Sequence, residues 1–123
     1  MKKIILIFLS IIYLFGFNNE IELFDTLFQV MLNKKKIKVY TKKYTHLGKN
    51  FIIVNSCKEA DIVLGELNCS KPRFVLDYYT LKSDKNAIGG FYWRKGRPQL
   101  RLRRANLEKY NLFISKEFED YLE

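Results

Sequence analysis

The chain has 123 residues, of which 48% are hydrophobic and 15% aromatic, and it carries a formal net charge of +9 at pH 7. This length allows one small domain, and the apolar fraction is too high for an intrinsically disordered chain. The excess of lysine and arginine favours negatively charged partners, such as anionic lipids, cell-wall polymers, small anions or acidic protein faces.

The start of the chain has the features of a secretory signal. Lys2 and Lys3 precede an apolar run from Ile4 to Phe17, and polar residues follow directly. A helix over this run rises about 21 Å, short of the roughly 30 Å needed to cross a bilayer. We therefore expect residues 1–19 to be a signal peptide and residues 20–123 to be a single periplasmic domain. Because the small-residue cleavage pattern is missing, an uncleaved signal anchor in the inner membrane stays open.

The first half of the exported part predicts a helix followed by strands. Apolar residues recur at helical spacing from Glu20 to Asn33, and Asn33 and the lysines after it suit a helix end. Short apolar runs then predict strands at residues 37–40, 51–54, 60–65 and 73–76. The second of these strands is apolar throughout, which is expected of a buried central position. Asp77 to Ser83 can form a helical turn after the fourth strand.

The second half predicts a β-hairpin and a helical tail. Residues 87–93 and 99–103 alternate in polarity and flank the turn-rich segment 94–98. Two short helices are expected at residues 104–110 and 116–122, with a left-handed Asn111 ending the first and Ser115 capping the second. This order of elements predicts an α/β fold, with α+β as the alternative, as a single domain around one mixed sheet.

Cys57 and Cys69 are the only cysteines in the chain. An even number of cysteines in an exported protein favours a disulfide over a metal site. The segment between them includes an expected strand of about 20 Å, so the chain must fold back to bring the two Cα atoms within about 5.5 Å. Two partly buried thiols are the alternative.

The sequence gives no pattern for catalysis or for a cofactor. The single histidine, His46, lies in a polar loop without an acidic partner, and the carboxylates are scattered over different elements. Gly89 and Gly90 are followed by no phosphate-binding pattern and are better explained by a bulge or by close packing. Asp77 stands at a strand end, where it can serve a site or cap a helix. We expect no enzymatic activity, no cofactor and no metal.

The strongest local feature is a basic segment with two aromatic residues at its start. It places six basic residues within residues 94–104, directly after Tyr92 and Trp93. Alternation along the second hairpin strand predicts one apolar face and one cationic face. We interpret the segment as a binding site for an anion or an acidic partner, formed by Tyr92, Trp93, Arg94, Arg97, Arg101 and Arg103. The alternative is a solvated edge strand whose charges prevent aggregation.

Residues 89–118 resemble the YfiR-like periplasmic family. The shared features are a glycine leading into a hairpin, a basic-apolar strand from Arg97 to Leu102, a short helix, and a serine before the last helix; the strand at residues 60–64 is also similar. The first half of the chain departs from the family, and Asn111 stands where the family usually has glycine. The resemblance implies a periplasmic regulator that binds the periplasmic domain of a membrane-bound signalling protein, such as a diguanylate cyclase or a sensor kinase.

Two functions follow from these observations, and a third is disfavoured. The first is a non-enzymatic periplasmic regulatory protein whose basic hairpin contacts a membrane-bound signalling protein. The second is a small solute-binding module that holds an anion among Arg94, Arg97 and Arg101. Nucleic-acid binding requires that the apolar start of the chain is not a signal, because exported proteins rarely meet DNA or RNA.

Overall fold

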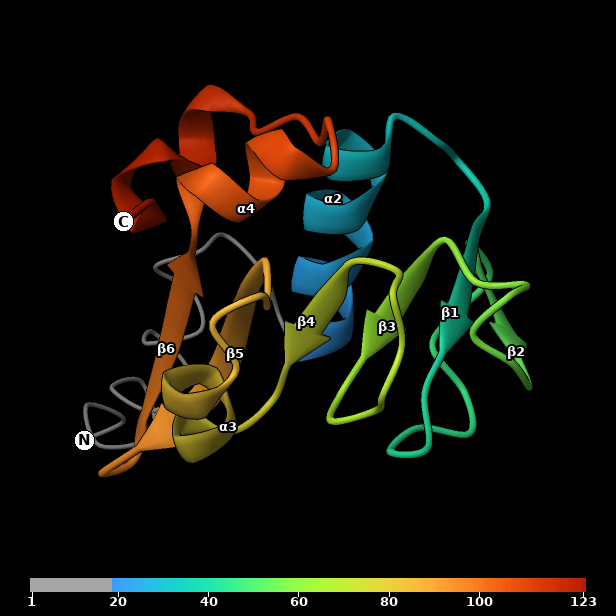
Figure 1. Cartoon of the computed structure of the whole chain (residues 1–123), viewed down its shortest axis with the longest axis horizontal. Helices are drawn as coiled ribbons and strands as arrows, with labels where there is room; N and C mark the ends of the chain where they lie inside the picture. Colours follow the sequence, from blue (N-terminus) through green and yellow to red (C-terminus); the bar gives the residue numbers. More distant parts are fainter. Residues whose placement is uncertain (1–18) are drawn as a thin grey trace, which may run out of the picture.

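A computed structural model describes residues 19–123 of the chain (Figure 1). Its elements in chain order are α2 (Glu20–Leu32), β1 (Ile37–Tyr40), β2 (Phe51–Val54), β3 (Ile62–Leu64), β4 (Arg73–Val75), α3 (Tyr78–Ser83), β5 (Gly89–Arg94), β6 (Arg97–Leu102), α4 (Arg104–Lys109) and the 3₁₀ helix η1 (Lys116–Tyr121).

All strands belong to one mixed sheet. Its six strands follow the order β2-β1-β3-β4-β5-β6. Strands β1 to β5 all run parallel to one another, and β6 alone runs antiparallel, beside β5. The expected α/β fold with a single mixed sheet is therefore confirmed.

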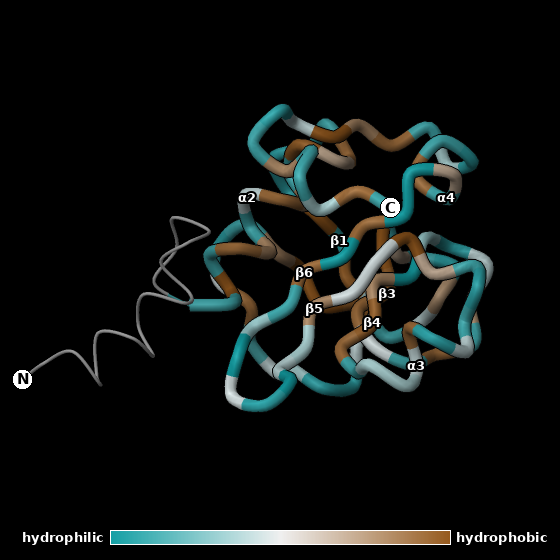
Figure 2. The backbone as a smooth tube through the Cα atoms, turned by 90° about the vertical axis from the view of Figure 1, so that its left-hand side faces the viewer, coloured by the Kyte–Doolittle hydropathy of each residue, from teal (hydrophilic) through white to brown (hydrophobic). Residues whose placement is uncertain are grey.

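Helix α2 covers one face of this sheet (Figure 1). Asn19 caps its start by accepting a hydrogen bond from the Glu22 amide at 2.9 Å, and Asn33 ends it in the left-handed conformation with φ 51°. The buried side of the helix presents Leu23, Phe24, Leu27, Phe28 and Met31. In Figure 2 the tube is hydrophobic along much of α2 and of the sheet strands. The core therefore lies between α2 and the sheet.

The C-terminal segment closes one end of this core. The Phe113 amide donates to the Met31 carbonyl at 3.0 Å, which ties the tail to the end of α2. The expected helix at residues 116–122 is a 3₁₀ helix that ends one residue earlier. Ser115 makes no side-chain capping bond there, so that expectation is wrong. Directly after this helix, Leu122 forms an isolated parallel bridge with Leu102 of β6.

Two strand predictions need correction. Strand β2 lies at the edge of the sheet and not at its centre, and Ile52 on it is 46% exposed. Its apolar sequence resembles that of a central strand because Phe51 and Ile53 both join the core. The third strand is also shorter than residues 60–65, because Gly65 turns the chain at φ 115° directly after Leu64.

The hairpin turn is tighter than residues 94–98. Lys95 and Gly96 both have positive φ, 53° and 77°, which is the geometry of a two-residue hairpin turn matched to strand twist. The paired strands therefore extend to Arg94 and Arg97. Pro98 lies within β6, which is an edge strand and can lose one amide donor.

Gly89 and Gly90 are sites of close packing, as expected. A Cβ atom on Gly89 would lie 2.4 Å from the Arg101 carbonyl oxygen, and one on Gly90 would lie 3.0 Å from Val75. The two glycines pair regularly with Leu102 and Arg101, without a bulge.

Cys57 and Cys69 form a disulfide, with their Cα atoms 5.6 Å apart. The chain folds back between them because β3 is short and Gly65 reverses its direction. The disulfide thereby joins the turn after β2 to the loop that leads into β4.

The expected signal peptide at residues 1–19 lies, apart from Asn19, outside the described residues. Within residues 19–123 no helix is long and apolar enough to cross a membrane.

The disulfide gives a first prediction. Replacing both cysteines, as in Cys57→Ser/Cys69→Ser, should lower the free energy of unfolding by about 2–4 kcal/mol, because the cross-link restricts the unfolded chain. Urea denaturation of the oxidised protein, the reduced protein and the double variant measures this loss. The double variant should not respond to reductant, and an unchanged midpoint for the reduced wild-type protein would contradict the prediction.

Candidate functional site

The register of the hairpin divides the expected site residues between two faces of the sheet. Because directly opposed residues share a face, Tyr92, Arg94, Arg97 and Arg101 lie on the face that carries α3. Trp93 lies on the other face, where its ring centroid is 6.1 Å from that of the core residue Phe91. The cationic and apolar faces expected from the alternation of β6 are present in the burial pattern of that strand.

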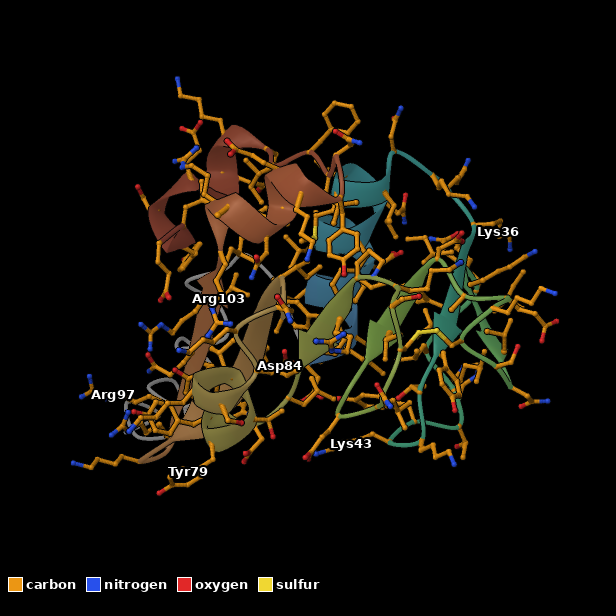
Figure 3. The ribbon with its side chains drawn as sticks, in the orientation of Figure 1. Lys36, Lys43, Tyr79, Asp84, Arg97 and Arg103 are labelled. Atoms are coloured by element: carbon orange, nitrogen blue, oxygen red, sulfur yellow. A yellow bond between two sulfur atoms is a disulfide. The ribbon has the colours of Figure 1, made fainter. Side chains whose placement is uncertain are left out.

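Arg103 is part of the framework that holds α3 on the sheet. Its guanidinium donates to the Leu81 carbonyl and, at 2.5 Å, to the Asp84 carbonyl at the end of α3. Beside it, Arg73 of β4 forms two hydrogen bonds of 2.7 and 2.8 Å with the Asp84 carboxylate. Figure 3 shows Arg103 and Asp84 away from the hairpin tip. Arg103 therefore helps to position α3, since its guanidinium binds two carbonyls at the end of that helix.

Arg101 is also engaged within the chain. It forms an ion pair with Glu123, near the bridge between Leu102 and Leu122. Hydrogen bonds to Tyr92 and Glu123 raise the pKa of the Arg101 guanidinium above its ordinary value. The three arginines that were expected to hold a small anion are thus not equivalent, because Arg101 already has a carboxylate partner.

The remaining hairpin residues form a surface together with the start of α3. The tyrosine rings of Tyr78 and Tyr92 lie 5.6 Å apart, and the Arg94 guanidinium lies 4.3 Å above the Tyr78 ring. A hollow of about 440 Å³ lies between the two elements. Figure 3 shows Tyr79 and Arg97 at this same end of the molecule. We call this region the α3–hairpin surface and define it by Tyr78, Tyr79, Arg94, Lys95 and Arg97. Trp93 is not a member, because its side chain lies on the other face of the sheet.

Three members of this surface, the tyrosines Tyr78 and Tyr79 and the turn residue Lys95, were not among the site residues expected from the sequence. Tyr79 is 74% exposed, and its ring packs against that of Tyr78 at 5.3 Å. Their proximity to the hairpin depends on α3 folding back onto β5, a contact between elements that no local pattern specifies. The adjacent pair of tyrosines after a strand was the one available signal.

The structure also shows where the other candidate residues from the sequence lie. Asp77 caps α3 by accepting a hydrogen bond from the Thr80 amide at 3.0 Å. His46 is exposed in the connection between β1 and β2. Among residues 19–123, no three His, Cys, Asp or Glu side chains are placed to hold a metal ion.

Comparison with known proteins gives no information about this site. No family model, no curated protein and no solved structure matches the chain. The resemblance to the YfiR-like family therefore stays an expectation from the sequence.

The anchoring of α3 gives a second prediction. At neutral pH, Asp84→Asn should lower the free energy of unfolding by about 1–3 kcal/mol, because Arg73 loses its charged acceptor. The hydrogen bond from Arg73 holds the pKa of the Asp84 carboxyl below its ordinary value of 3.8. This stabilisation is complete above that value and is lost as the pH falls below it through the folded-state pKa.

Denaturant unfolding of the wild-type protein and Asp84→Asn over a range of pH measures the effect. The stability difference between them should shrink as the pH falls below about 4. The matched control Asp120→Asn, at an exposed position, should show neither a neutral-pH loss nor this convergence. A stability difference that stays constant with pH would contradict the prediction.

Proposed function

We propose that the chain is a non-enzymatic, exported regulatory protein that binds an acidic face of a protein partner through the α3–hairpin surface. The observation that carries this proposal is the convergence of the rings of Tyr78 and Tyr79 with the cations Arg94, Lys95 and Arg97 where α3 meets the hairpin tip. The apolar run after Lys2 and Lys3 supports export, which removes nucleic acid from the available partners.

The aromatic part of the surface supports a protein partner. Tyr79 is 74% exposed although it is a large amphipathic side chain, and its ring packs against that of Tyr78. Tyrosine, tryptophan and arginine are enriched among the few residues that dominate binding energy at protein interfaces. The hollow between α3 and the hairpin offers space for a side chain of the partner.

The charges of the surface specify an acidic partner. Arg94 and Arg97 are directly opposed across the hairpin, an arrangement of like charges that weakens a strand pair. Lys95 adds a third cation in the turn between them. Placing cations together at a cost in stability is typical of a surface kept for binding. An acidic partner removes this repulsion and is also attracted over a distance.

The resemblance to the YfiR-like family suggests which kind of protein the partner is. It points to the periplasmic domain of a membrane-bound signalling protein, such as a diguanylate cyclase or a sensor kinase. In this proposal the chain acts by occupying an acidic face of that domain. The anion-binding alternative among Arg94, Arg97 and Arg101 has less support, because Arg101 is paired with Glu123.

Site-specific photo-crosslinking tests the proposal. We replace Tyr79 with p-benzoylphenylalanine in the full chain, irradiate intact cells, and identify the products by mass spectrometry. The expected product is a covalent complex with an extracytoplasmic protein domain, joined at an acidic segment. The matched control carries the same probe in place of Phe113, which is 59% exposed but lies at the end of α2, and it should not give this product.

The same cross-link should depend on the cations beside it. Arg94→Ala/Arg97→Ala should weaken binding of the identified domain about tenfold or more, and the effect should shrink at high salt. Thermal unfolding confirms that the variant is folded. The proposal fails if positions 79 and 113 give the same products, if only lipid is labelled at position 79, or if the arginine variant binds as well as the wild-type protein.

A further inference from the structure

A second candidate site lies at the carboxyl edge of the parallel strands. The chain leaves β1 toward β2 on one side and leaves β3 toward β4 on the other, so the connections diverge between β1 and β3. In open α/β sheets, ligands bind in the crevice where neighbouring connections diverge in this way. A crevice of about 290 Å³ is present at that point. The carboxyl ends of β1 and β3 lie at the lower edge of the sheet in Figure 1.

The crevice has an apolar floor and charged walls. Leucines contribute the apolar part, namely Leu64, Leu67 and Leu76. Lys42 and Lys43 line it from the connection after β1, and Figure 3 shows Lys43 at this edge. Glu66 and Asp77 line it from the segments after β3 and β4. Positive and negative side chains thus come from different strands to one small space.

These opposite charges do not neutralise each other. The three ion pairs among residues 19–123 join Lys34 to Asp61, Arg73 to Asp84, and Arg101 to Glu123, and none involves the crevice. The carboxylates are instead oriented by Thr80, whose hydroxyl lies 3.2 Å from Asp77 and 3.4 Å from Glu66. The lysines and the carboxylates thus line the crevice without forming ion pairs with each other, so a ligand with both charges can pair with both.

We propose that this crevice binds a small zwitterion of the size of an amino acid. The carboxylate of the ligand pairs with Lys42 and Lys43, and its ammonium group pairs with Glu66 and Asp77. An apolar side chain of the ligand lies on the leucine floor. The volume of about 290 Å³ fits a single amino acid and is too small for a nucleotide or a peptide. This site does not depend on the α3–hairpin surface or on the identity of its partner.

Ligand titration followed by amide chemical shifts tests the proposal. The purified protein is titrated with each standard L-amino acid at millimolar concentration, and with 4-methylpentanoate and 3-methylbutylamine, which resemble leucine but lack its ammonium or its carboxylate. An apolar amino acid should shift the amides of Gly65, Glu66 and Thr80. Each single-charge analogue should bind about tenfold or more weakly, because one charged partner in the crevice stays unpaired.

Charge variants distinguish this site from general surface binding. Glu66→Gln and Lys42→Gln/Lys43→Gln should each weaken binding of the amino acid about tenfold or more. Lys49→Gln is the matched control, because Lys49 is exposed in the same connection but does not line the crevice. The proposal is overturned if no amino acid shifts these amides, if 4-methylpentanoate binds as tightly as leucine, or if the control weakens binding equally. Each result stands apart from the cross-linking at Tyr79, which reports only on the protein partner.

Discussion

Phe24 and Phe28 of α2 stack 5.5 Å apart and pack edge-on against Phe74 at the middle of the sheet, and the other elements are arranged around this contact. Through this contact α2, the one long helix of the described residues, covers a single face of the sheet. A sheet buried on both faces needs a second layer. That layer consists of the short helix α3, packed over Val75 and Tyr92, and of the connections joined by the disulfide. Both proposed sites lie where this thin second layer ends.

The thin layer needs polar anchors because its apolar contacts are few. The second hydrophobic cluster has four buried members, Val75, Leu81, Ala87 and Tyr92. Asp84 therefore has an important role, since its carboxylate binds Arg73 and its carbonyl accepts from Arg103. A partly buried ion pair stabilises a fold little more than apolar packing would, but removing one of its partners leaves the other charge unpaired. The pair thus specifies where α3 lies, and Tyr78 and Tyr79 reach the hairpin only because α3 lies there.

The sequence predicts local features well and contacts between distant elements poorly. The ends of α2 and α4 follow from Asn33 and Asn111, which both adopt positive φ, and the faces of β6 follow from its alternation. The edge position of β2 could not be predicted, because apolar content reflects burial on one face as well as a central position. For the hairpin, alternation identifies the cationic face but not which arginines are free. The partners of Arg103 are carbonyls of α3, and the partner of Arg101 is Glu123 at the end of the chain.

The crevice and the α3–hairpin surface meet at the start of α3. Leu76 and Asp77 line both the crevice and the hollow beside the hairpin. The far end of α3 is held by Arg73 and Arg103, whereas its start is held by the cap from Asp77 and by ring contacts. A ligand affects binding of a partner only if it favours one of two arrangements of a shared element. The start of α3 is the segment that touches both sites. Any coupling between a zwitterion in the crevice and a protein on the hairpin therefore has to pass through Asp77 and the tyrosines that follow it.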